Sequence, residues 1–311
     1  MEAFYEELCK NITKEGSVLR EEPMKNHTTF RVGGPAEYYV TVTTTEELQT
    51  VVRLCNRHEV PWVVLGNGSN VLVSDTGIRG AVLRLSGEFA RCEITEDIFN
   101  GRAEAVAGAG MLLSAFAMRL AKKGFSGFEF AAGIPGSVGG AVMMNAGAYG
   151  GEIRDCITQA EIITADGERK LLSAEELQLS YRHSILMEKK GIVTKAWFSF
   201  SVCSKLYILS NIELLNRRRK EKQPLEYPSA GSTFKRPEGN YAGKLIMEAG
   251  LAGKQIGGAA VSEKHCGFII NKANATATDI YMLMRYVIQK VEETSGIRLE
   301  PEVKLLGDFL A

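Results

Sequence analysis

Residues 131–152 read AAGIPGSVGGAVMMNAGAYGGE, and this stretch decides how the fold of the chain is interpreted. Seven of its residues are glycines, most of the others are apolar, and Glu152 is its single charged residue. Glycine lets main-chain N–H groups approach an anion with no Cβ in the way, and it accepts positive φ angles. The stretch therefore predicts a cradle for a phosphate group. The alternative is a set of tight turns between buried strands.

A second glycine loop, GNGSN, occupies residues 66–70 between two β-branched runs, 63–65 and 71–73, that predict strands. It is not the dinucleotide fingerprint of a Rossmann fold, because Val71 stands where a third glycine is needed and a strand follows instead of a helix. Taken alone, the loop fits a plain hairpin turn. Taken with residues 131–152, it predicts a diphosphate held between two loops of a non-Rossmann fold.

The composition of the 311-residue chain narrows the class of protein, and its length predicts about two domains. Lys plus Arg and Asp plus Glu both number 37, so no net charge favours nucleic acid or an anionic membrane as a partner. The six cysteines are scattered without a C-x-x-C pair, which disfavours a metal site and a disulfide framework. No apolar leader or membrane-length apolar run is present, so we expect a cytoplasmic protein, monomeric by default.

Helix and strand signals alternate along the chain. One predicted helix begins after Thr44, and two others cover 112–122 and 278–296. The predicted strands include 81–85, 105–109 and 297–306. The pair Ser173 and Glu176 predicts a short capped helix. The charged run NRRRKEKQ at 216–223 is typical of a solvated helix end, and we place a domain boundary before it, near residue 204.

Eight segments of the chain occur in the order found in one enzyme family. They are NHTTFRVGGPAEY (26–38), LGNGSN (65–70), GIPGSVGGAVMMNAGAYGGE (133–152), SYRHS (180–184), KQPLEYPSAGSTFKRP (222–237), AGKLI (242–246), IGGAAVSEKHCGFIIN (256–271) and LEPEVKLLG (299–307). In these segments the chain closely resembles the UDP-N-acetylenolpyruvoylglucosamine reductases, and the match covers nearly the whole chain. The resemblance implies a flavoenzyme of peptidoglycan synthesis that uses NADPH to reduce UDP-N-acetylglucosamine enolpyruvate to UDP-N-acetylmuramate.

The resemblance also implies a fold and a cofactor. The fold class would be α+β, with a two-lobed FAD-binding domain of the PCMH or vanillyl-alcohol-oxidase type over residues 1–204 and a break near 80. A smaller α+β substrate-binding domain would cover 205–299, and a strand at 300–311 would carry a catalytic glutamate back to the active site. FAD would be bound non-covalently and NADPH would be the co-substrate in a ping-pong reaction. The family has a longer form with a tyrosine-bearing loop, and this chain resembles the shorter form without it.

Carried over from the family, the catalytic residues are Arg182, Ser232 and Glu302. A guanidinium meets the negative charge that develops on the substrate carboxylate, and a serine hydroxyl delivers a proton to the adjacent carbon. Each residue has an ordinary alternative role. Arg182 alone fits a surface ion pair, Ser232 fits a turn hydroxyl beside Gly231, and Glu300 is a rival to Glu302.

The predicted binding residues come from both glycine loops, the charged run and the C-terminal motifs. The predicted FAD contacts are Gly66, Asn67, Gly68, Ser69, Asn70, Gly133, Pro135, Gly136, Ser137, Gly139, Gly140, Asn145, Gly147, Ala148, Tyr149 and Arg219. The predicted substrate contacts are Lys235, Arg236, Lys244 and His265, and His265 fits an ordinary structural histidine equally well. No metal site is predicted.

Two other functions stay open at this point. One is another flavin oxidase or dehydrogenase on the same FAD-binding fold, which rapid reoxidation of the reduced flavin by oxygen would favour. The other is a non-catalytic nucleotide-binding module, which the presence of Arg182, Ser232 and Glu302 argues against.

Overall fold

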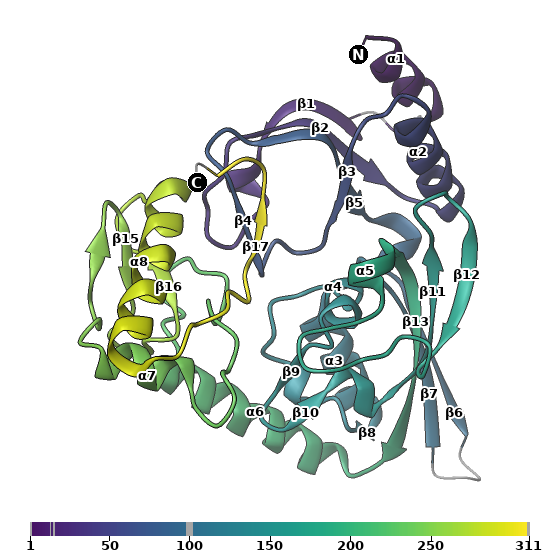
Figure 1. The fold of residues 1–311 in the computed structure, drawn as a ribbon. Coiled ribbons are helices and arrows are strands. Elements are labelled where there is room, and N and C mark those ends of the chain that lie inside the picture. Colours follow the sequence, from purple (N-terminus) through teal and green to yellow (C-terminus); the bar gives the residue numbers. More distant parts are fainter. Residues whose placement is uncertain (1, 13, 15, 98–101, 310–311) are drawn as a thin grey trace. The chain divides into compact units, whose positions relative to one another are not determined.

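The structure is a computed structural model that describes residues 2–12, 14, 16–97 and 102–309 (Figure 1). Its α-helices are α1 (Glu2–Asn11), α2 (Thr45–Arg57), α3 (Leu113–Lys123), α4 (Val138–Met143), α5 (Leu186–Lys189), α6 (Lys205–Lys222), α7 (Ala242–Glu248) and α8 (Ala277–Ser295). Its strands are β1 (Val18–Pro23), β2 (Pro35–Val42), β3 (Trp62–Leu65), β4 (Val71–Val73), β5 (Ile78–Leu85), β6 (Cys92–Asp97), β7 (Arg102–Gly108), β8 (Phe125–Ser126), β9 (Gly147–Ala148), β10 (Gly151–Glu152), β11 (Ile157–Ile163), β12 (Arg169–Ser173), β13 (Ile192–Val202), β14 (Gln255–Ile256), β15 (Ala259–Val261), β16 (Ile269–Asn271) and β17 (Lys304–Leu306).

The chain divides into two compact units, each built from separate segments. Unit 1 contains Met1–Arg20, Tyr38–Asn67 and Gly80–Arg218, and unit 2 contains Glu21–Glu37, Gly68–Arg79 and Arg219–Ala311. The division at Arg79–Gly80 separates a segment of unit 2 from unit 1, whereas the break expected near 80 was between two lobes of the FAD-binding domain. The later division falls inside α6, after the expected boundary near 204. The two early segments of unit 2 were not expected there. They join it because Phe30, Val32 and Leu72 are buried in its hydrophobic core.

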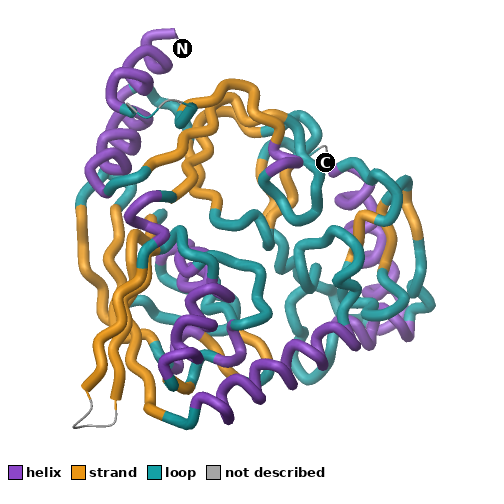
Figure 2. The backbone as a smooth tube through the Cα atoms, turned by 180° about the vertical axis from the view of Figure 1, so that it is seen from behind, coloured by secondary structure: helices purple, strands orange, loops and turns teal. Residues whose placement is uncertain are grey.

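An antiparallel sheet with the strand order β12-β11-β13-β7-β6 forms the centre of unit 1, and β8 also pairs with β13. Helices α3 and α4 lie along one face of this sheet (Figures 1 and 2). Along β13, buried and half-buried residues alternate, as expected for a strand with one covered face. Phe198 and Phe200 on that face contact the Phe116 ring of α3 at centroid distances of 5.3 and 6.3 Å. This aromatic packing joins α3 to the sheet.

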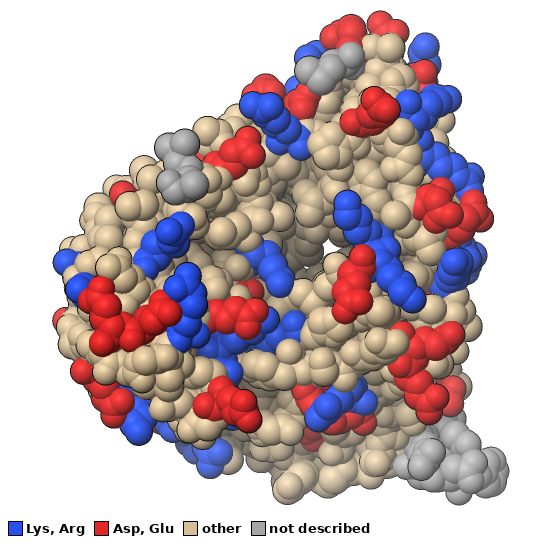
Figure 3. All heavy atoms as spheres, viewed as in Figure 1, with Lys and Arg blue, Asp and Glu red and all other residues tan. Residues whose placement is uncertain are grey.

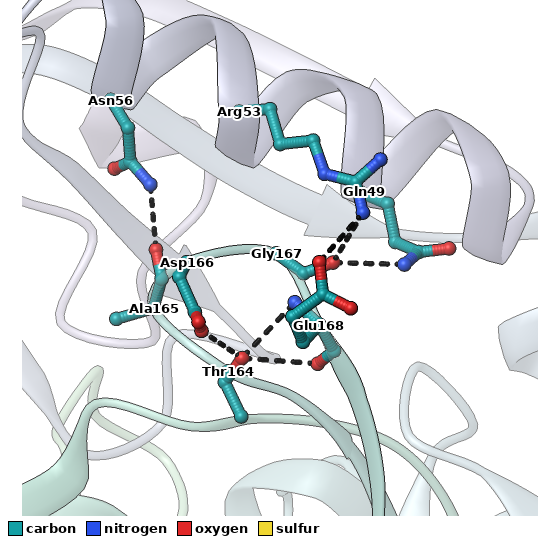
Figure 4. A network of polar contacts seen from close by, with 8 residues as sticks. All are labelled: Gln49, Arg53, Asn56, Thr164, Ala165, Asp166, Gly167 and Glu168. Carbon is teal, nitrogen blue, oxygen red and sulfur yellow. Dashed lines mark hydrogen bonds and ion pairs between the residues drawn. The ribbon is translucent and has the colours of Figure 1, made fainter.

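Helix α2 is tied to the turn between β11 and β12 by polar side chains (Figure 4). Gln49 donates to the carbonyl of Gly167 at 2.8 Å, and Asn56 donates to the carbonyl of Ala165 at 2.7 Å. Arg53 completes the network through an ion pair of 3.1 Å with Glu168. The helix that precedes β3 is therefore fixed to the edge of the central sheet of unit 1.

In unit 2, α8 packs on the three-stranded sheet β14-β15-β16. Ile280, Leu283 and Val287 are fully buried on one face of the helix, which confirms the amphipathic pattern read from the sequence. Thr276 caps its start and Gly296, with a φ of 70°, ends it. The helix covers Ala277–Ser295, close to the range 278–296 expected from the apolar periodicity of the sequence.

The GNGSN loop is not a hairpin turn. Strand β3 before it pairs in parallel with β5, whereas β4 after it pairs in parallel with β17, so the flanking strands belong to different sheets. The hairpin interpretation is therefore wrong. It failed because β4 pairs with a strand more than 230 residues away, which its three apolar residues cannot indicate.

Two further expectations differ from the structure. The Ser173 and Glu176 bonds do form, yet residues 174–178 make a turn instead of a helix, because the chain leads directly into Leu177 buried in the core. The strand expected at 297–306 is confined to β17. Pro301 has no N–H for a ladder, and it is found in an isolated bridge with Phe234.

Charged residues of both signs are interspersed on the face shown in Figure 3. That distribution agrees with the balanced composition of the chain, and it gives that face no single-sign field. No helix among the described residues combines the length and the apolar character needed to cross a membrane.

The start of α8 yields a prediction about stability. The Asp75 carboxylate accepts hydrogen bonds from the N–H groups of Ala277 and Thr278, each at 2.8 Å, and from the Thr278 hydroxyl at 2.7 Å. Loss of a helix cap costs about 0.5–2 kcal/mol. We expect Asp75→Ala to lower the free energy of unfolding by about that much in urea titration. Asp75→Asn, which keeps one carbonyl acceptor, should lose less. Equal stability of all three proteins would contradict this role.

Candidate functional site

The two glycine loops meet in unit 1. Gly66 passes so close to Ser137 that a Cβ at position 66 would lie 2.4 Å from the Ser137 Oγ. Beside this contact, the Asn67 amide donates to the carbonyl of Pro135 at 2.7 Å. The structure therefore brings together the two loops that the sequence paired, and a side chain at residue 66 would require the Ser137 hydroxyl to move.

A hollow with a cavity volume of about 90 Å³ opens beside this contact. It is lined by Val64, Leu65, Gly66, Arg84, Leu85, Ala109, Gly110, Ser137, Gly139, Gly140, Met143, Gly191, Ile192 and Val193. Four of these residues, Gly66, Ser137, Gly139 and Gly140, were predicted cofactor contacts. Arg84 is the single charged residue among the described residues that line it. The sequence carried no local signal for Arg84, whose direct neighbours in β5, Leu83 and Leu85, are apolar.

Main chain forms much of the wall of this hollow. Ser137 caps α4 by accepting a hydrogen bond from the Gly140 N–H at 3.3 Å. Gly139 lies against Ala109, where an added Cβ would approach the Ala109 Cβ to 2.8 Å, and its N–H donates to the Ala109 carbonyl at 2.8 Å. Close packing at Gly139 thus holds the main chain of this segment against Ala109.

The other residues predicted from the glycine-rich stretch form its turns. Gly136 accepts a hydrogen bond from the Leu113 N–H at 2.9 Å, and Gly133 is half-buried before it. Gly147 and Ala148 form β9, which pairs with β10, and Tyr149 follows with a φ of 54° and an exposed ring. These positions shape the loop, and their contact with a cofactor stays a prediction.

Asn145 is a buried hub inside the glycine-rich stretch. Its amide donates to the Glu152 carboxylate at 2.8 Å and to the Ser180 carbonyl at 3.0 Å, while its Oδ1 accepts from the Arg154 N–H at 2.9 Å. Both amide hydrogens are therefore used within the protein. The structure gives this predicted cofactor contact a supporting role, in which its side chain holds the Ser180 segment.

Arg182 lies in the tight turn that this hub supports. Ser180 and His183 exchange hydrogen bonds of 3.1 and 3.2 Å, and the buried Ser184 hydroxyl donates to the Met143 carbonyl at 2.7 Å. Arg182 takes a left-handed conformation with a φ of 55°, and its guanidinium donates to the Gly147 carbonyl at 3.4 Å. The predicted catalytic arginine is thus fixed against the glycine-rich stretch of unit 1.

The other two predicted catalytic residues lie on adjacent segments of unit 2. The Glu302 N–H donates to the carbonyl of Thr233, the residue after Ser232, at 2.8 Å. Thr233 is fully buried, whereas Ser232 is exposed at the end of the turn that contains Gly231. The structure therefore brings the Ser232 and Glu302 segments together by main-chain pairing.

The structure also separates Glu302 from its rival. Glu300 forms an ion pair of 2.6 Å with Lys235, and the Lys235 N–H donates to the Glu300 carbonyl at 2.8 Å. Burial is the main cause of the lowered pKa of Lys304, and the nearby charge of Lys235 adds to it. The charges of Glu300 and Glu302 oppose this shift, because a nearby anion stabilises the charged form of the lysine.

The remaining predicted contacts lie in unit 2 with partners of their own. Arg236 stacks over the Tyr241 ring at 4.6 Å, and Lys244 of α7 pairs with Glu248 at 3.7 Å. Arg219 of α6 donates to Gln223 at 2.9 Å. In the second loop, Gly68 passes so close to His27 that a Cβ would lie 2.0 Å from its carbonyl oxygen, and Ser69 follows it half-buried.

His265 is half-buried against the ring of Phe268, with centroids 4.9 Å apart. Burial lowers the pKa of its imidazole, because the charged form loses hydration. The Gly267 N–H donates to Nδ1 at 3.2 Å, which requires this nitrogen to be unprotonated. A neutral ring with its proton on Nε2 follows.

Thiol and metal chemistry find little support here. Burial raises the pKa of Cys55 to about 12, and burial likewise raises the pKa of Cys156, which follows the glycine-rich stretch. Both thiols are therefore protonated and poor nucleophiles. Within residues 2–12, 14, 16–97 and 102–309, no three His, Cys, Asp or Glu side chains come together as a metal site requires.

Comparison with known proteins assigns both halves of the chain. Residues 36–173 match the model of an FAD binding domain, and residues 223–306 match the model of the C-terminal domain of UDP-N-acetylenolpyruvoylglucosamine reductase. The chain is 53% identical over 303 residues to the UDP-N-acetylenolpyruvoylglucosamine reductase of Lachnoclostridium phytofermentans, covering 96% of each chain. It is 51% identical over 298 residues to that of Agathobacter rectalis, covering 94% of this chain and 95% of the relative.

A solved structure agrees with these matches. The UDP-N-acetylenolpyruvylglucosamine reductase from Thermus caldophilus superposes with a TM-score of 0.78 at 40% identity, covering 93% of this chain and 99% of that one. The α+β class is confirmed, with an FAD-binding type of fold in the first part of the chain and the reductase C-terminal domain in the second.

The contact at Gly66 yields a prediction with an internal control. In Gly66→Ala the new methyl group meets the Ser137 Oγ, and overpacking of this kind costs about 1–3 kcal/mol. In a Ser137→Ala background the nearest remaining atom is Cβ at 3.5 Å, an ordinary contact. We therefore expect Gly66→Ala to destabilise the wild type in thermal unfolding and to change the Ser137→Ala protein much less. Equal costs in both backgrounds would show that the contact is not limiting.

The lowered pKa of His265 yields a prediction about pH. Below about pH 6.5 the unfolded chain protonates this histidine, whereas the folded chain resists protonation until its lower pKa is reached. The free energy of unfolding should therefore fall as the pH drops from about 6.5 through that window. Urea unfolding at pH 7.5 and 5.5 should show a smaller acid loss for His265→Gln than for the wild type. Identical losses would contradict the burial of a neutral imidazole.

Proposed function

This chain belongs to the UDP-N-acetylenolpyruvoylglucosamine reductase family, and from that membership we propose that it reduces UDP-N-acetylglucosamine enolpyruvate to UDP-N-acetylmuramate with NADPH. FAD is the proposed cofactor, and peptidoglycan synthesis is the proposed role. The observation that carries the proposal is the meeting of Gly66 and Ser137, because it builds a main-chain cradle inside the segment that matches an FAD binding domain.

The residues at the cradle fit FAD. The hollow offers peptide groups of both glycine loops for a diphosphate, apolar walls for a flat ring system and one cation, Arg84. Bound FAD would carry the hydride from NADPH to the enolpyruvyl group. Non-covalent attachment is proposed because Cys156, which follows the glycine-rich stretch, has a raised pKa and a buried thiol that donates to Ile153.

The catalytic residues of the chain have complementary proposed tasks. Arg182 would bind the substrate carboxylate through two parallel hydrogen bonds, an interaction that strengthens as negative charge moves onto that group. Ser232 would donate its hydroxyl proton to the carbon beside the carboxylate. Glu302 would complete the site next to Ser232, through the pairing with Thr233. We also propose that NADPH and the sugar nucleotide react in turn, as in a ping-pong reaction.

Binding of the sugar nucleotide draws on unit 2. His265 would offer its Nε2–H as a neutral donor, and Lys235, Arg236 and Lys244 would supply cations for the diphosphate. Between Arg182 and Ser232 the chain forms α5, β13 and α6, which supports the shorter form of the enzyme. Other groups must then cover the nucleotide.

We further propose a monomer that acts in the cytoplasm. Every predicted catalytic residue comes from one chain, so a second copy is not needed to complete the site. NADPH and nucleotide sugars are cytoplasmic metabolites, and the balanced charge of the chain gives it no general attraction to nucleic acid.

An anaerobic absorbance experiment tests this function. The purified protein should be yellow, lose its flavin absorbance on addition of NADPH, and regain it only when UDP-N-acetylglucosamine enolpyruvate is added. A colourless protein that takes up no FAD would contradict the cradle. Rapid recovery of colour with oxygen alone would instead favour a flavin oxidase on the same fold.

Replacement of the proton donor separates the two half-reactions. In Ser232→Ala, NADPH should still bleach the flavin at the wild-type rate, whereas turnover of the enolpyruvyl substrate should fall by about 10²–10⁴-fold, as for loss of a general acid. Ser229→Ala, three residues earlier in the same segment, serves as the matched control and should stay near wild type. Steady-state and stopped-flow absorbance measure both rates. Unchanged turnover in Ser232→Ala would show that another group donates the proton.

A further inference from the structure

Asn70, the last residue of the GNGSN loop, is bonded to the segment that carries Glu302. Its side-chain Nδ2 donates to the main-chain carbonyl of Glu302 at 3.2 Å. In return, the Lys304 N–H donates to the Asn70 carbonyl at 3.0 Å. Directly after these bonds, Val71 pairs with Lys304 in the parallel ladder of β4 and β17. Asn70 thus anchors the chain at the point where β17 begins.

The other side of Glu302 is held by Thr233. The Glu302 N–H donates to the Thr233 carbonyl at 2.8 Å. Thr233 is itself immobilised, because its N–H donates to Gly267 at 2.8 Å and its buried hydroxyl accepts from the Ile269 N–H at 2.9 Å. Both main-chain polar groups of Glu302 are therefore bonded, one to Thr233 and one to Asn70. The position of this residue depends on the two contacts together.

We propose that Asn70 is a positioning residue for Glu302, and that its side chain serves the catalytic carboxylate instead of the cofactor. The inference rests on the proposed function, which gives Glu302 its catalytic place. An asparagine suits this task, because its amide supplies the N–H donor that the Glu302 carbonyl needs. Aspartate has the same shape without that donor, and its charge would repel the carbonyl oxygen.

The other asparagine of the loop provides a built-in contrast. Asn67 donates to Pro135 in the glycine-rich stretch, on the side of the proposed cradle. The two asparagines stand three residues apart in one pentapeptide, and their side chains hold different segments. The Asn67 side chain bonds to the glycine-rich stretch, whereas the Asn70 side chain bonds to the Glu302 segment.

The experiment compares the FAD-loaded wild type with Asn70→Asp and Asn70→Ala. We expect flavin affinity within about twofold of wild type and an unchanged rate of reduction by NADPH. Reoxidation by the enolpyruvyl substrate should slow by about tenfold, because small displacements of a catalytic group cost up to about 10²-fold in rate. In a Glu302→Gln background, Asn70→Ala should slow reoxidation little further, since it acts through Glu302.

Hydrogen–deuterium exchange gives a readout that does not depend on activity. Amides of residues 302–304 should exchange faster in both Asn70 variants. The matched control Asn67→Ala should show the opposite pattern, with weaker flavin binding and unchanged exchange at 302–304.

Three results would overturn the proposal. The first is weaker flavin binding with normal reoxidation in Asn70→Asp. The second is a double variant in which the rate losses caused by Asn70→Ala and Glu302→Gln multiply fully. The third is unchanged hydrogen–deuterium exchange of the amides at 302–304. Failure of the wild type to be reoxidised by the enolpyruvyl substrate would instead contradict the proposed function. The exchange experiment would still decide whether Asn70 holds this segment.

Discussion

The approach of Gly66 to Ser137 is the constraint on which the proposed cofactor site depends. At this point two loops pass so closely that a Cβ on residue 66 would lie 2.4 Å from the Ser137 Oγ and would displace this hydroxyl. The contact places Asn67 within reach of Pro135 and leaves the hollow bordered by main chain. Because protein interiors are close-packed, the absence of one Cβ sets the distance between two segments about 70 residues apart in sequence.

The GNGSN loop also contacts the segment of unit 2 that carries Glu302, the proposed catalytic glutamate. Between Asn67 and Gly68 the chain passes from unit 1 to unit 2, and Gly68 packs directly on the main chain of His27. Asn70 then bonds to Glu302, and β4 runs parallel to β17. One pentapeptide therefore carries the proposed cradle at its first residue and the support of the predicted catalytic glutamate at its last. Only four peptide bonds separate these two residues.

Local signals in the sequence predicted those features that local chemistry controls. Helix α2 begins after Thr44, whose hydroxyl accepts a hydrogen bond from the Glu47 N–H, because caps act within one turn of the chain. The pairing of the two glycine loops was also predictable, since both had the composition of an anion cradle. The catalytic residues required the resemblance to a family, because a single arginine, serine or glutamate is ambiguous by itself.

Long-range features escaped prediction for a physical reason. Strand β4 has three residues and pairs with a strand near the C-terminus, and Phe30 is buried in a core made mostly of later residues. Neither the strand that pairs with β4 nor the core around Phe30 can be inferred from the residues that lie next to them in the sequence. The sequence did not indicate Arg84 as a binding residue, because the residues directly beside it in β5 are apolar. Only the folded structure shows that it lines the hollow. Asn145 was assigned to the cofactor because its residue type suits both a ligand and a buried hub.

Three residues in or near the glycine-rich stretch have a strained backbone conformation. Asn145, Tyr149 and Arg182 all have positive φ angles, between 41° and 55°, although none is a glycine. Each such residue costs about 1–2 kcal/mol relative to an extended or helical conformation. The turn around Arg182 keeps this conformation because Asn145 bonds to Ser180 on one side and Ser184 bonds to Met143 on the other. Strain held by buried hydrogen bonds fixes where a side chain points before any ligand arrives, and it is typical of functional sites. Arg182, the arginine proposed to meet a developing negative charge, is thus oriented by the stretch that borders the proposed flavin cradle.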